Sequence, residues 1–254
     1  MKGSSTMTTD LQGTTALVTG ATSGIGRATA VALAKQRSHV AVAGRNRQRG
    51  DQVVNEITAA GGRAVFVAAD LTDAASARRL AVEATEQLGQ VDIVVNNAGV
   101  YPFGTTESMT EADFDAVFDL NVRVPFFLVA ELGPAMAARG HGAIINLSTM
   151  VAEYGNVGTS LYGASKAAVV SMTKTWAAEY GPHGVRVNAV SPGPTSTEGT
   201  AGMTDALGQL AAPAPAGRPA SADEIAEAIV FLASQRASYI HGAILPVDGG
   251  RAAI

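Results

Sequence analysis

Tyr162 and Lys166 are the residues of this chain whose types and spacing most directly suggest chemistry. They stand four positions apart at the end of NLSTMVAEYGNVGTSLYGASK, residues 146–166, so in a helix both side chains would lie on one face. A phenol with a pKa of about 10 exchanges protons poorly near neutral pH, but an adjacent ammonium stabilises the phenolate and lowers that pKa. With a hydroxyl to hold a carbonyl oxygen, such a tyrosine could protonate the oxygen as a hydride reaches the carbon. Taken alone, the pair could equally be an ordinary surface contact.

Three glycines, Gly20, Gly24 and Gly26, could bring the backbone close to a phosphate. They lie in TGATSGIG, between a predicted strand and a helix predicted from about Ile25. Glycines permit close approach to a pyrophosphate, and the N-terminus of a helix supplies free N–H groups and positive potential. The spacing is G-x-x-x-G-x-G, and the same cluster taken alone is also compatible with a tight turn. Its place between a strand and a helix favours a dinucleotide site.

The second predicted strand ends in an arginine where a site that prefers NAD usually carries an acid. Arg45 and Asn46 follow HVAVAG, and no acid occurs before Asp51. A guanidinium suits bidentate contact with a 2′-phosphate, so NADP(H) is favoured over NAD(H). The alternative is a solvated loop cation, since two further arginines stand beside it. Asp70, after the third predicted strand, could accept from an adenine amino group or cap a helix.

Asn121 stands on the apolar face of a predicted helix. The helix has a start signal at Thr110, and FDAVF, residues 114–118, places apolar side chains at helical spacing before Asn121. A buried amide needs hydrogen-bond partners. Pro125 has no N–H, so it cannot bond the carbonyl of Asn121, which predicts a free carbonyl and a kink. The alternative is that the helix simply ends near Val124.

The elements that must position these residues follow from the hydrophobic pattern. Continuous apolar runs alternate with helical patterns, which indicates strands covered on both faces and hence a mostly parallel sheet. The expected fold is α/β, one doubly wound domain over residues 11–254 with a seven-stranded sheet and helices on both faces. A flexible tail is expected over residues 1–10, and a mobile substrate loop over about 197–220. A helix near Asp223 should start at a capping box formed by Ser221 and Glu224. The strand-like runs are TALVTG, HVAVAG, AVFVAAD, VDIVVNNAG, GAIINLS, VRVNAVSPG and AILPVDGG.

Composition narrows the class of protein. The 254 residues are 47% hydrophobic and 16% charged with a net charge of −4, which argues against disorder and against nucleic acid as a partner. There is no cysteine, and the four histidines show no metal-ligand spacing, so no metal site is expected. The N-terminus is unlike a secretory signal and no apolar run is long enough to span a membrane. We therefore expect a cytoplasmic protein that does not bind a membrane.

The complete set of motifs is far more specific than any one of them. It resembles the classical short-chain dehydrogenase/reductases, especially those similar to 3-oxoacyl-carrier-protein reductases, from about Leu11 to Gly250. The resemblance implies a single Rossmann-type domain, a nicotinamide cofactor, hydride transfer between carbonyl and alcohol carbons, and commonly a homotetramer. The motifs occur in this order: TGATSGIG, DL at 70–71, NNAG at 96–99, Asn121, YGASK at 162–166, Asn188 and PG at 192–193.

The resemblance also implies residue roles. Tyr162 would be the general acid/base, and Lys166 would hold the nicotinamide ribose and lower the tyrosine pKa. Asn121 would support a water-mediated proton relay from Lys166, and the backbone of Thr195 would contact the carboxamide. The cofactor contacts that it implies are Gly20, Ser23, Gly24, Ile25, Gly26, Arg45, Asn46, Asp70, Leu71, Asn97, Ala98, Gly99, Tyr162, Lys166, Pro192, Gly193, Thr195 and Thr197.

One position departs from the family pattern, in which a catalytic serine usually stands thirteen residues before the tyrosine. Counting back from Tyr162 reaches Thr149, with Ser148 beside it. Successive side chains of a strand point to opposite faces, so only one hydroxyl can face the carbonyl and the count selects Thr149. Its methyl should narrow the pocket and leave the hydrogen bond. Ser148 remains the alternative if a bulge shifts the register.

These residues predict an NADPH-dependent reductase of a small ketone, reversible as an alcohol dehydrogenase. One alternative is an NAD-dependent alcohol dehydrogenase of the same family. Another is a catalytically weak NADP-binding regulatory protein, for which the unusual Thr149 is the hint. No basic cluster in the expected loop suits an acyl-carrier protein. Candidate wall residues, each of which could equally be packing, are Tyr101, Phe103, Met150, Tyr154, Leu161 and Met203.

Overall fold

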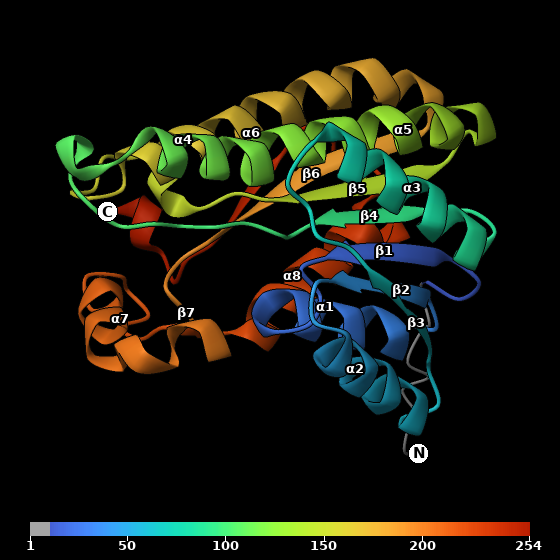
Figure 1. Cartoon of the computed structure of the whole chain (residues 1–254), viewed down its shortest axis with the longest axis horizontal. Helices are drawn as coiled ribbons and strands as arrows, with labels where there is room; N and C mark the ends of the chain where they lie inside the picture. Colours follow the sequence, from blue (N-terminus) through green and yellow to red (C-terminus); the bar gives the residue numbers. More distant parts are fainter. Residues whose placement is uncertain (1–10) are drawn as a thin grey trace, which may run out of the picture.

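A seven-stranded parallel sheet forms the centre of the molecule (Figure 1). The computed structural model describes residues 11–254, so the tail expected over residues 1–10 lies outside the described residues. The strand order is β3-β2-β1-β4-β5-β6-β9, and every neighbouring pair in it is parallel. The expected α/β fold is therefore confirmed. The strands are β1 (Thr15–Thr19), β2 (His39–Gly44), β3 (Arg63–Ala68), β4 (Ile93–Asn96), β5 (Gly142–Leu147), β6 (Val185–Pro192) and β9 (Ile244–Val247).

Helices cover both faces of this sheet. One hydrophobic cluster joins the sheet to α1, α2 and α8, and a second joins its other face to α3, α5 and α6. Figure 1 shows these two helical layers on opposite sides of the strands. The helices are α1 (Gly24–Lys35), α2 (Arg47–Ala59), α3 (Ala74–Leu88), α4 (Glu111–Phe118), α5 (Val124–Arg139), α6 (Ser160–Tyr180), α7 (Thr204–Ala211) and α8 (Ala222–Ala233).

Continuous apolar runs form strands here because both faces of the sheet are covered. All five residues of β1 and all eight of β6 are buried. The helix starts that the sequence predicts are also present. Thr110 and Asp113 form a capping box before α4, and Ser221 and Glu224 form another before α8.

The order in which the chain adds strands to the sheet reverses between β1 and β4. The chain moves outward through β2 and β3, then returns to place β4 on the other side of β1. In open parallel sheets, the loops at the carboxyl ends of two such strands diverge and leave a crevice. The loop after β1 holds Gly20, and the loop after β4 holds Asn97.

The segment after β6 departs from the expectation of a long loop over residues 197–220. Short strands β7 (Thr195–Ser196) and β8 (Ala220–Ser221) pair at its base, followed by a 3₁₀ helix η5 (Glu198–Met203) and then α7. Thr197 forms a capping box with Thr200 at the start of η5. Loop is thus the wrong description for residues 198–211, because a capping box starts η5 and the apolar residues of α7 fall at helical spacing. We call residues 197–211 the lid.

Residues 11–254 contain neither a membrane-spanning helix nor a metal-binding cluster. No helix there is long and apolar enough to cross a membrane. The same residues contain no cluster of histidine, aspartate and glutamate suited to hold a metal ion.

Candidate active site

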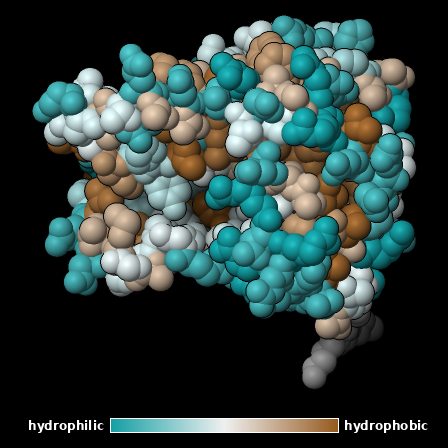
Figure 2. All heavy atoms as spheres, viewed as in Figure 1, coloured by the Kyte–Doolittle hydropathy of each residue, from teal (hydrophilic) through white to brown (hydrophobic). Residues whose placement is uncertain are grey.

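A cavity of about 790 Å³ opens at the carboxyl ends of the central strands. The space-filling view shows a hollow between the lid and the remainder of the molecule (Figure 2). Of the residues predicted for the site, Asn46 and Asn121 lie outside its wall. Those that line it are Gly20, Ser23, Gly24, Ile25, Gly26, Arg45, Asp70, Leu71, Asn97, Ala98, Gly99, Ser148, Thr149, Tyr162, Lys166, Pro192, Gly193, Thr195 and Thr197.

Tyr162 and Thr149 meet at the inner end of this cavity. Tyr162 is in the first turn of α6, and Thr149 follows β5 in extended conformation with φ −166°. The Thr149 hydroxyl lies close enough to the phenol of Tyr162 to lower its pKa, and the threonine is 8% exposed. The tyrosine therefore has one hydroxyl neighbour with which it can share a bound oxygen.

Ser148 has a different environment. Its backbone N–H donates to the carbonyl of Val190 at 2.8 Å, which extends the β5–β6 ladder beyond Leu147 without a bulge. The residue is 3% exposed, and its Oγ has no hydrogen-bond partner among the described residues. It also lines the cavity, so both hydroxyls border the site, but only that of Thr149 affects the pKa of Tyr162.

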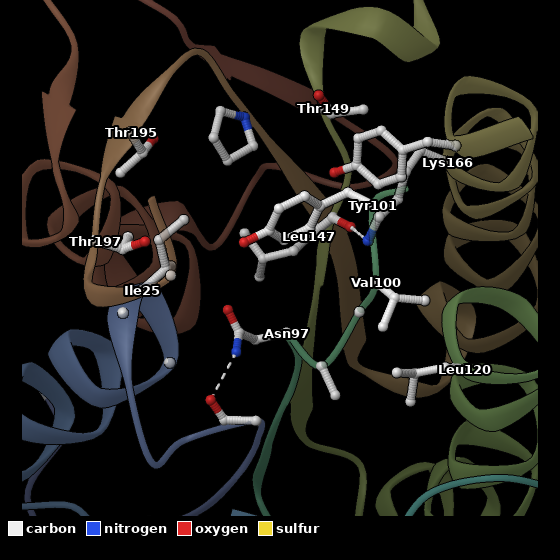
Figure 3. Close-up of a pocket in the computed structure, with 18 of the residues that line it drawn as sticks. Ile25, Asn97, Val100, Tyr101, Leu120, Leu147, Thr149, Lys166, Thr195 and Thr197 are labelled. Atoms are coloured by element: carbon white, nitrogen blue, oxygen red, sulfur yellow. Dashed lines mark hydrogen bonds between the residues drawn. The ribbon is translucent and has the colours of Figure 1, made fainter. Parts of the chain in front are cut away.

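Lys166 is buried one helical turn beyond Tyr162. Its side chain is 4% exposed and its Nζ donates to the carbonyl of Leu147 at 2.7 Å, a bond drawn in Figure 3. Burial lowers the pKa of Lys166 to about 8. The Nζ lies 6.0 Å from the centroid of the Tyr162 ring, so the expected shared helix face is confirmed.

The expected lowering of the Tyr162 pKa by Lys166 is wrong. Burial raises the pKa of Tyr162 to about 12, and the hydrogen bond from Thr149 opposes this while nearby Tyr101 adds to it. The physical reason is that desolvation disfavours the phenolate, whereas the Lys166 ammonium is directed at a carbonyl. A phenol in this state is a proton donor at neutral pH.

Asn121 lies within a π-helical turn, η2 (Asp119–Arg123), that joins α4 to α5. The helix therefore continues through this region, and the alternative that it ends near Val124 is wrong. The amide is 1% exposed; its Nδ2 donates to the Val100 carbonyl at 2.9 Å and to Ser165 Oγ at 3.1 Å. Its Oδ1 accepts from the Val100 N–H at 2.9 Å. Asn121 thus fixes the loop after β4 against α6.

The glycine loop is held in place by Asn97. Gly20 and Gly24 have positive φ angles, 64° and 54°, which favour glycine. A Cβ at Gly26 would collide with the carbonyl oxygen of Gly20. The Asn97 Nδ2 donates to the carbonyls of Thr19 and Gly20, at 2.8 and 3.2 Å, and Figure 3 draws one of these two bonds. The side chain predicted to contact adenosine is therefore also a support for the loop.

The N–H groups at the start of α1 can bind an anion, as one side chain of the lid demonstrates. Glu198 Oε2 accepts from the Gly24 N–H at 2.7 Å. A carboxylate oxygen and a phosphate oxygen are equivalent acceptors for such a donor. Together with the close backbone approach that Gly26 permits, this contact shows that the residues present fit the pyrophosphate of a dinucleotide.

Positive charge lies at the outer end of the cavity. Arg45 follows β2 and is mostly exposed; its Nε lies 4.0 Å from Asp70 Oδ1. Asn46 caps α2 through Arg49 N–H, which explains why it does not line the cavity. Asp73, and not Asp70, caps α3. Asp70 is thus free of the capping role and lines the cavity beside Leu71.

The inner wall is largely apolar. Tyr101 packs edge-on against Tyr162 and Phe103, with ring centroids 6.1 and 6.2 Å apart. Met150 also lines the cavity, but Tyr154, Leu161 and Met203 do not. Figure 3 shows Thr195 and Thr197 on the side opposite Lys166 and Val100. Apolar wall residues that the sequence did not single out include Val100, Leu120, Leu147, Val151, Leu207 and Leu210; the last two come from α7, whose helix was not predicted.

Comparisons with known proteins agree with this architecture. Residues 20–252 match the family model described as enoyl-(acyl carrier protein) reductase. A 3-oxoacyl-[acyl-carrier-protein] reductase FabG of Thermotoga maritima is 35% identical over 241 residues, covering 94% of this chain and 98% of the relative.

Two solved structures are similar over nearly the whole chain. A short chain dehydrogenase/reductase family protein is 49% identical with a TM-score of 0.88, covering 96% of this chain and 100% of the other. A blue fluorescent protein from a metagenomic library, solved in complex with NADPH, is 35% identical with a TM-score of 0.91, covering 96% and 99%.

Proposed function

Because this chain belongs to the classical short-chain dehydrogenase/reductase family, we propose that it is an NADPH-dependent reductase of a small neutral ketone, reversible as an alcohol dehydrogenase. One observation carries the proposal. The Thr149 hydroxyl lies next to Tyr162, and Lys166 is buried one turn further along the same helix. The relative solved with NADPH supports the choice of nicotinamide cofactor. An oxidoreductase acting on CH–OH and C=O groups is the activity common to the family.

NADPH, when bound, would supply the hydride that adds to the carbonyl carbon. The glycine loop and Arg45 would hold its pyrophosphate and 2′-phosphate, and Lys166 its nicotinamide ribose. Thr149 donates a hydrogen bond to the carbonyl oxygen, where negative charge develops. Tyr162 then gives its proton to the same oxygen, and in the reverse direction the phenolate takes that proton back.

Asn121 has a supporting part in this scheme. It is hydrogen-bonded to the backbone at Val100 and to Ser165 in α6. The Asn121 amide thereby holds the loop after β4, which forms part of the cavity wall, against α6, which carries Tyr162 and Lys166. A water-mediated proton relay from Lys166 past this turn would restore the Tyr162 proton after each turnover.

The charges around the cavity favour a neutral substrate. Of its charged lining residues, Arg45 and Asp70 come from the loops after β2 and β3, Arg49 comes from the first turn of α2, and Lys166 donates to a carbonyl. Asp119 forms an ion pair with Arg123. Among the described residues, no other cation lines the cavity to offset the desolvation of a substrate carboxylate.

The lid is equally unsuited to an acidic carrier protein. Glu198 and Asp205 are its charged residues, and both are acidic. Arg218, beyond the lid, forms a bidentate pair with Glu224. A free ketone with an apolar or aromatic body, packed against Tyr101 and the leucines of α7, is the substrate that these contacts favour.

The decisive experiment is NADPH oxidation with a panel of neutral cyclic and aryl ketones. Tyr162→Phe should lower kcat by a factor on the order of 10² to 10⁴, the usual contribution of a general acid, while the Kd of NADPH stays unchanged. Tyr239→Phe is the matched control, because Tyr239 is 99% exposed and lies outside the cavity. NADPH binding without turnover on the whole panel would favour a binding protein instead.

The family resemblance also predicts a homotetramer, and the sequence pattern predicts a cytoplasmic location. Size-exclusion chromatography with light scattering tests the assembly, since a tetramer and a monomer of 25.8 kDa differ fourfold in mass.

A further inference from the structure

Glu198, the first residue of η5, reaches out of the lid and contacts the glycine loop. Its Oε2 accepts from the Gly24 N–H at 2.7 Å, across 174 positions of sequence. The backbone N–H groups of Glu198 itself and of Gly24 lower the pKa of this carboxyl, with a smaller contribution from Arg27 and Arg49. The carboxylate is therefore charged at neutral pH.

Positive groups surround this carboxylate on three sides. Arg27 NH1 lies 3.6 Å from Glu198 Oε1. Arg49 adds a further attraction and lines the same cavity. The N-terminus of α1 contributes the third positive field, directed along the helix axis. Of these groups, the N-terminus of α1 and Arg49 line the cavity, where a cofactor pyrophosphate would otherwise use them.

The lid packs against the loop at the same point. A Cβ built on Gly24 would lie 3.3 Å from Cβ and Cγ2 of Thr197. The capping box of Thr197 and Thr200 fixes the start of η5, and so it fixes the direction in which Glu198 points. The lid therefore packs directly against the N-terminus of α1.

We propose that Glu198 is an internal anion that occupies the pyrophosphate position and must leave it when cofactor binds, which makes it a determinant of cofactor affinity. The proposal rests on the dinucleotide function proposed above. One N–H cannot donate fully to a carboxylate and a phosphate together, and two anions within a few ångströms repel each other. Cofactor binding therefore carries the cost of expelling the carboxylate, and residues 198–203 move with it.

The test measures binding, without turnover, using two adenosine ligands. ADP-ribose 2′-phosphate carries the pyrophosphate, whereas adenosine 2′-monophosphate carries only the 2′-phosphate. Glu198→Gln keeps the length of the side chain and an acceptor oxygen but removes the charge. Its Kd for ADP-ribose 2′-phosphate should fall by about five- to tenfold, the value of one charge-assisted hydrogen bond reduced for partial exposure. Its Kd for adenosine 2′-monophosphate should stay unchanged.

Asp205→Asn is the matched control, because it removes the same charge from an exposed position of the lid. Its affinity for both ligands should equal that of the wild type. Calorimetric titration of the three proteins gives the Kd values, and their melting temperatures confirm folding. Glu198→Ala serves as a second variant and should bind ADP-ribose 2′-phosphate at least as tightly as Glu198→Gln.

Several results would overturn the inference. Unchanged or weaker binding of ADP-ribose 2′-phosphate by both Glu198 variants would mean that Glu198 does not compete. An equal gain in affinity for the two ligands, or the same gain in Asp205→Asn, would mean that only the overall charge of the lid matters. If the wild type bound neither ligand, the proposed function itself would fail, and that outcome differs from all of these.

Discussion

Replacement of Thr149 by valine removes the hydroxyl from the candidate site and keeps its shape. The residue is 8% exposed and its hydroxyl lies close enough to the phenol of Tyr162 to lower its pKa, so valine preserves the packing and deletes one donor. Loss of a donor to a developing oxyanion typically reduces kcat by a factor on the order of 10² to 10³, or about 2.7 to 4 kcal/mol. We expect a loss in this range for ketone reduction, measured as NADPH oxidation with saturating ketone.

The pH dependence gives an independent readout of the same change. The Thr149 hydrogen bond lowers the pKa of Tyr162, which burial raises to about 12. Without it the pKa rises further. Alcohol oxidation needs the phenolate as base, so its rate increases with pH, and in Thr149→Val this rise should shift to higher pH. Ketone reduction needs the phenol, which is fully present near pH 7 in both proteins.

Two companion variants make the test specific. Ser148→Ala deletes an Oγ that has no partner within residues 11–254, so it should change kcat little and leave the melting temperature equal or higher. Thr149→Ser keeps the hydroxyl and removes the methyl, and it should retain most of the activity while accepting bulkier ketones. A large loss in Ser148→Ala with a small loss in Thr149→Val would refute the assignment of the hydroxyls.

Two further predictions concern charged groups. Arg45→Ala should lower the ratio of kcat/KM for NADPH over that for NADH by about tenfold, as expected for one largely exposed charge–phosphate contact; an unchanged ratio would mean that Arg45 does not read the 2′-phosphate. Burial lowers the pKa of Lys166 from 10.5 to about 8, so the folded protein loses this proton before the unfolded chain does, and stability should rise between about pH 8 and 10.5. Lys166→Met should therefore raise the free energy of unfolding in urea by up to about 3 kcal/mol near pH 7 and by much less near pH 10; an equal gain at both values would contradict this origin.

The parts of the fold that the sequence predicts are those set by local patterns. Runs such as TALVTG become strands because they are buried on both faces. Ser221 and Glu224 start α8 where their spacing indicates. The position of Arg45 at the end of β2 also follows from pattern alone. Alternation along an extended strand explains why adjacent hydroxyls, Ser148 and Thr149, have different neighbours.

The remaining features depend on contacts between distant segments. The Lys166 Nζ donates to the carbonyl of Leu147, and burial raises the pKa of Tyr162. Glu198 and Gly24 are in contact although 174 positions of sequence separate them. The lid helices stand in a segment rich in Gly, Ala and Thr, whose composition does not indicate that η5 and α7 form there. No spacing rule in the sequence reports such long-range pairings.

The π-helical turn at Asp119–Arg123 makes the site sensitive to the number of residues in a helix, as well as to their identity. A π turn holds one more residue than the α-helical turn it replaces. Deletion of a single residue there could leave α4 and α5 as one regular rod with the hydrophobic core intact. Asn121 would then rotate away from Val100 and Ser165, so a length change of one residue could remove the function and spare the fold.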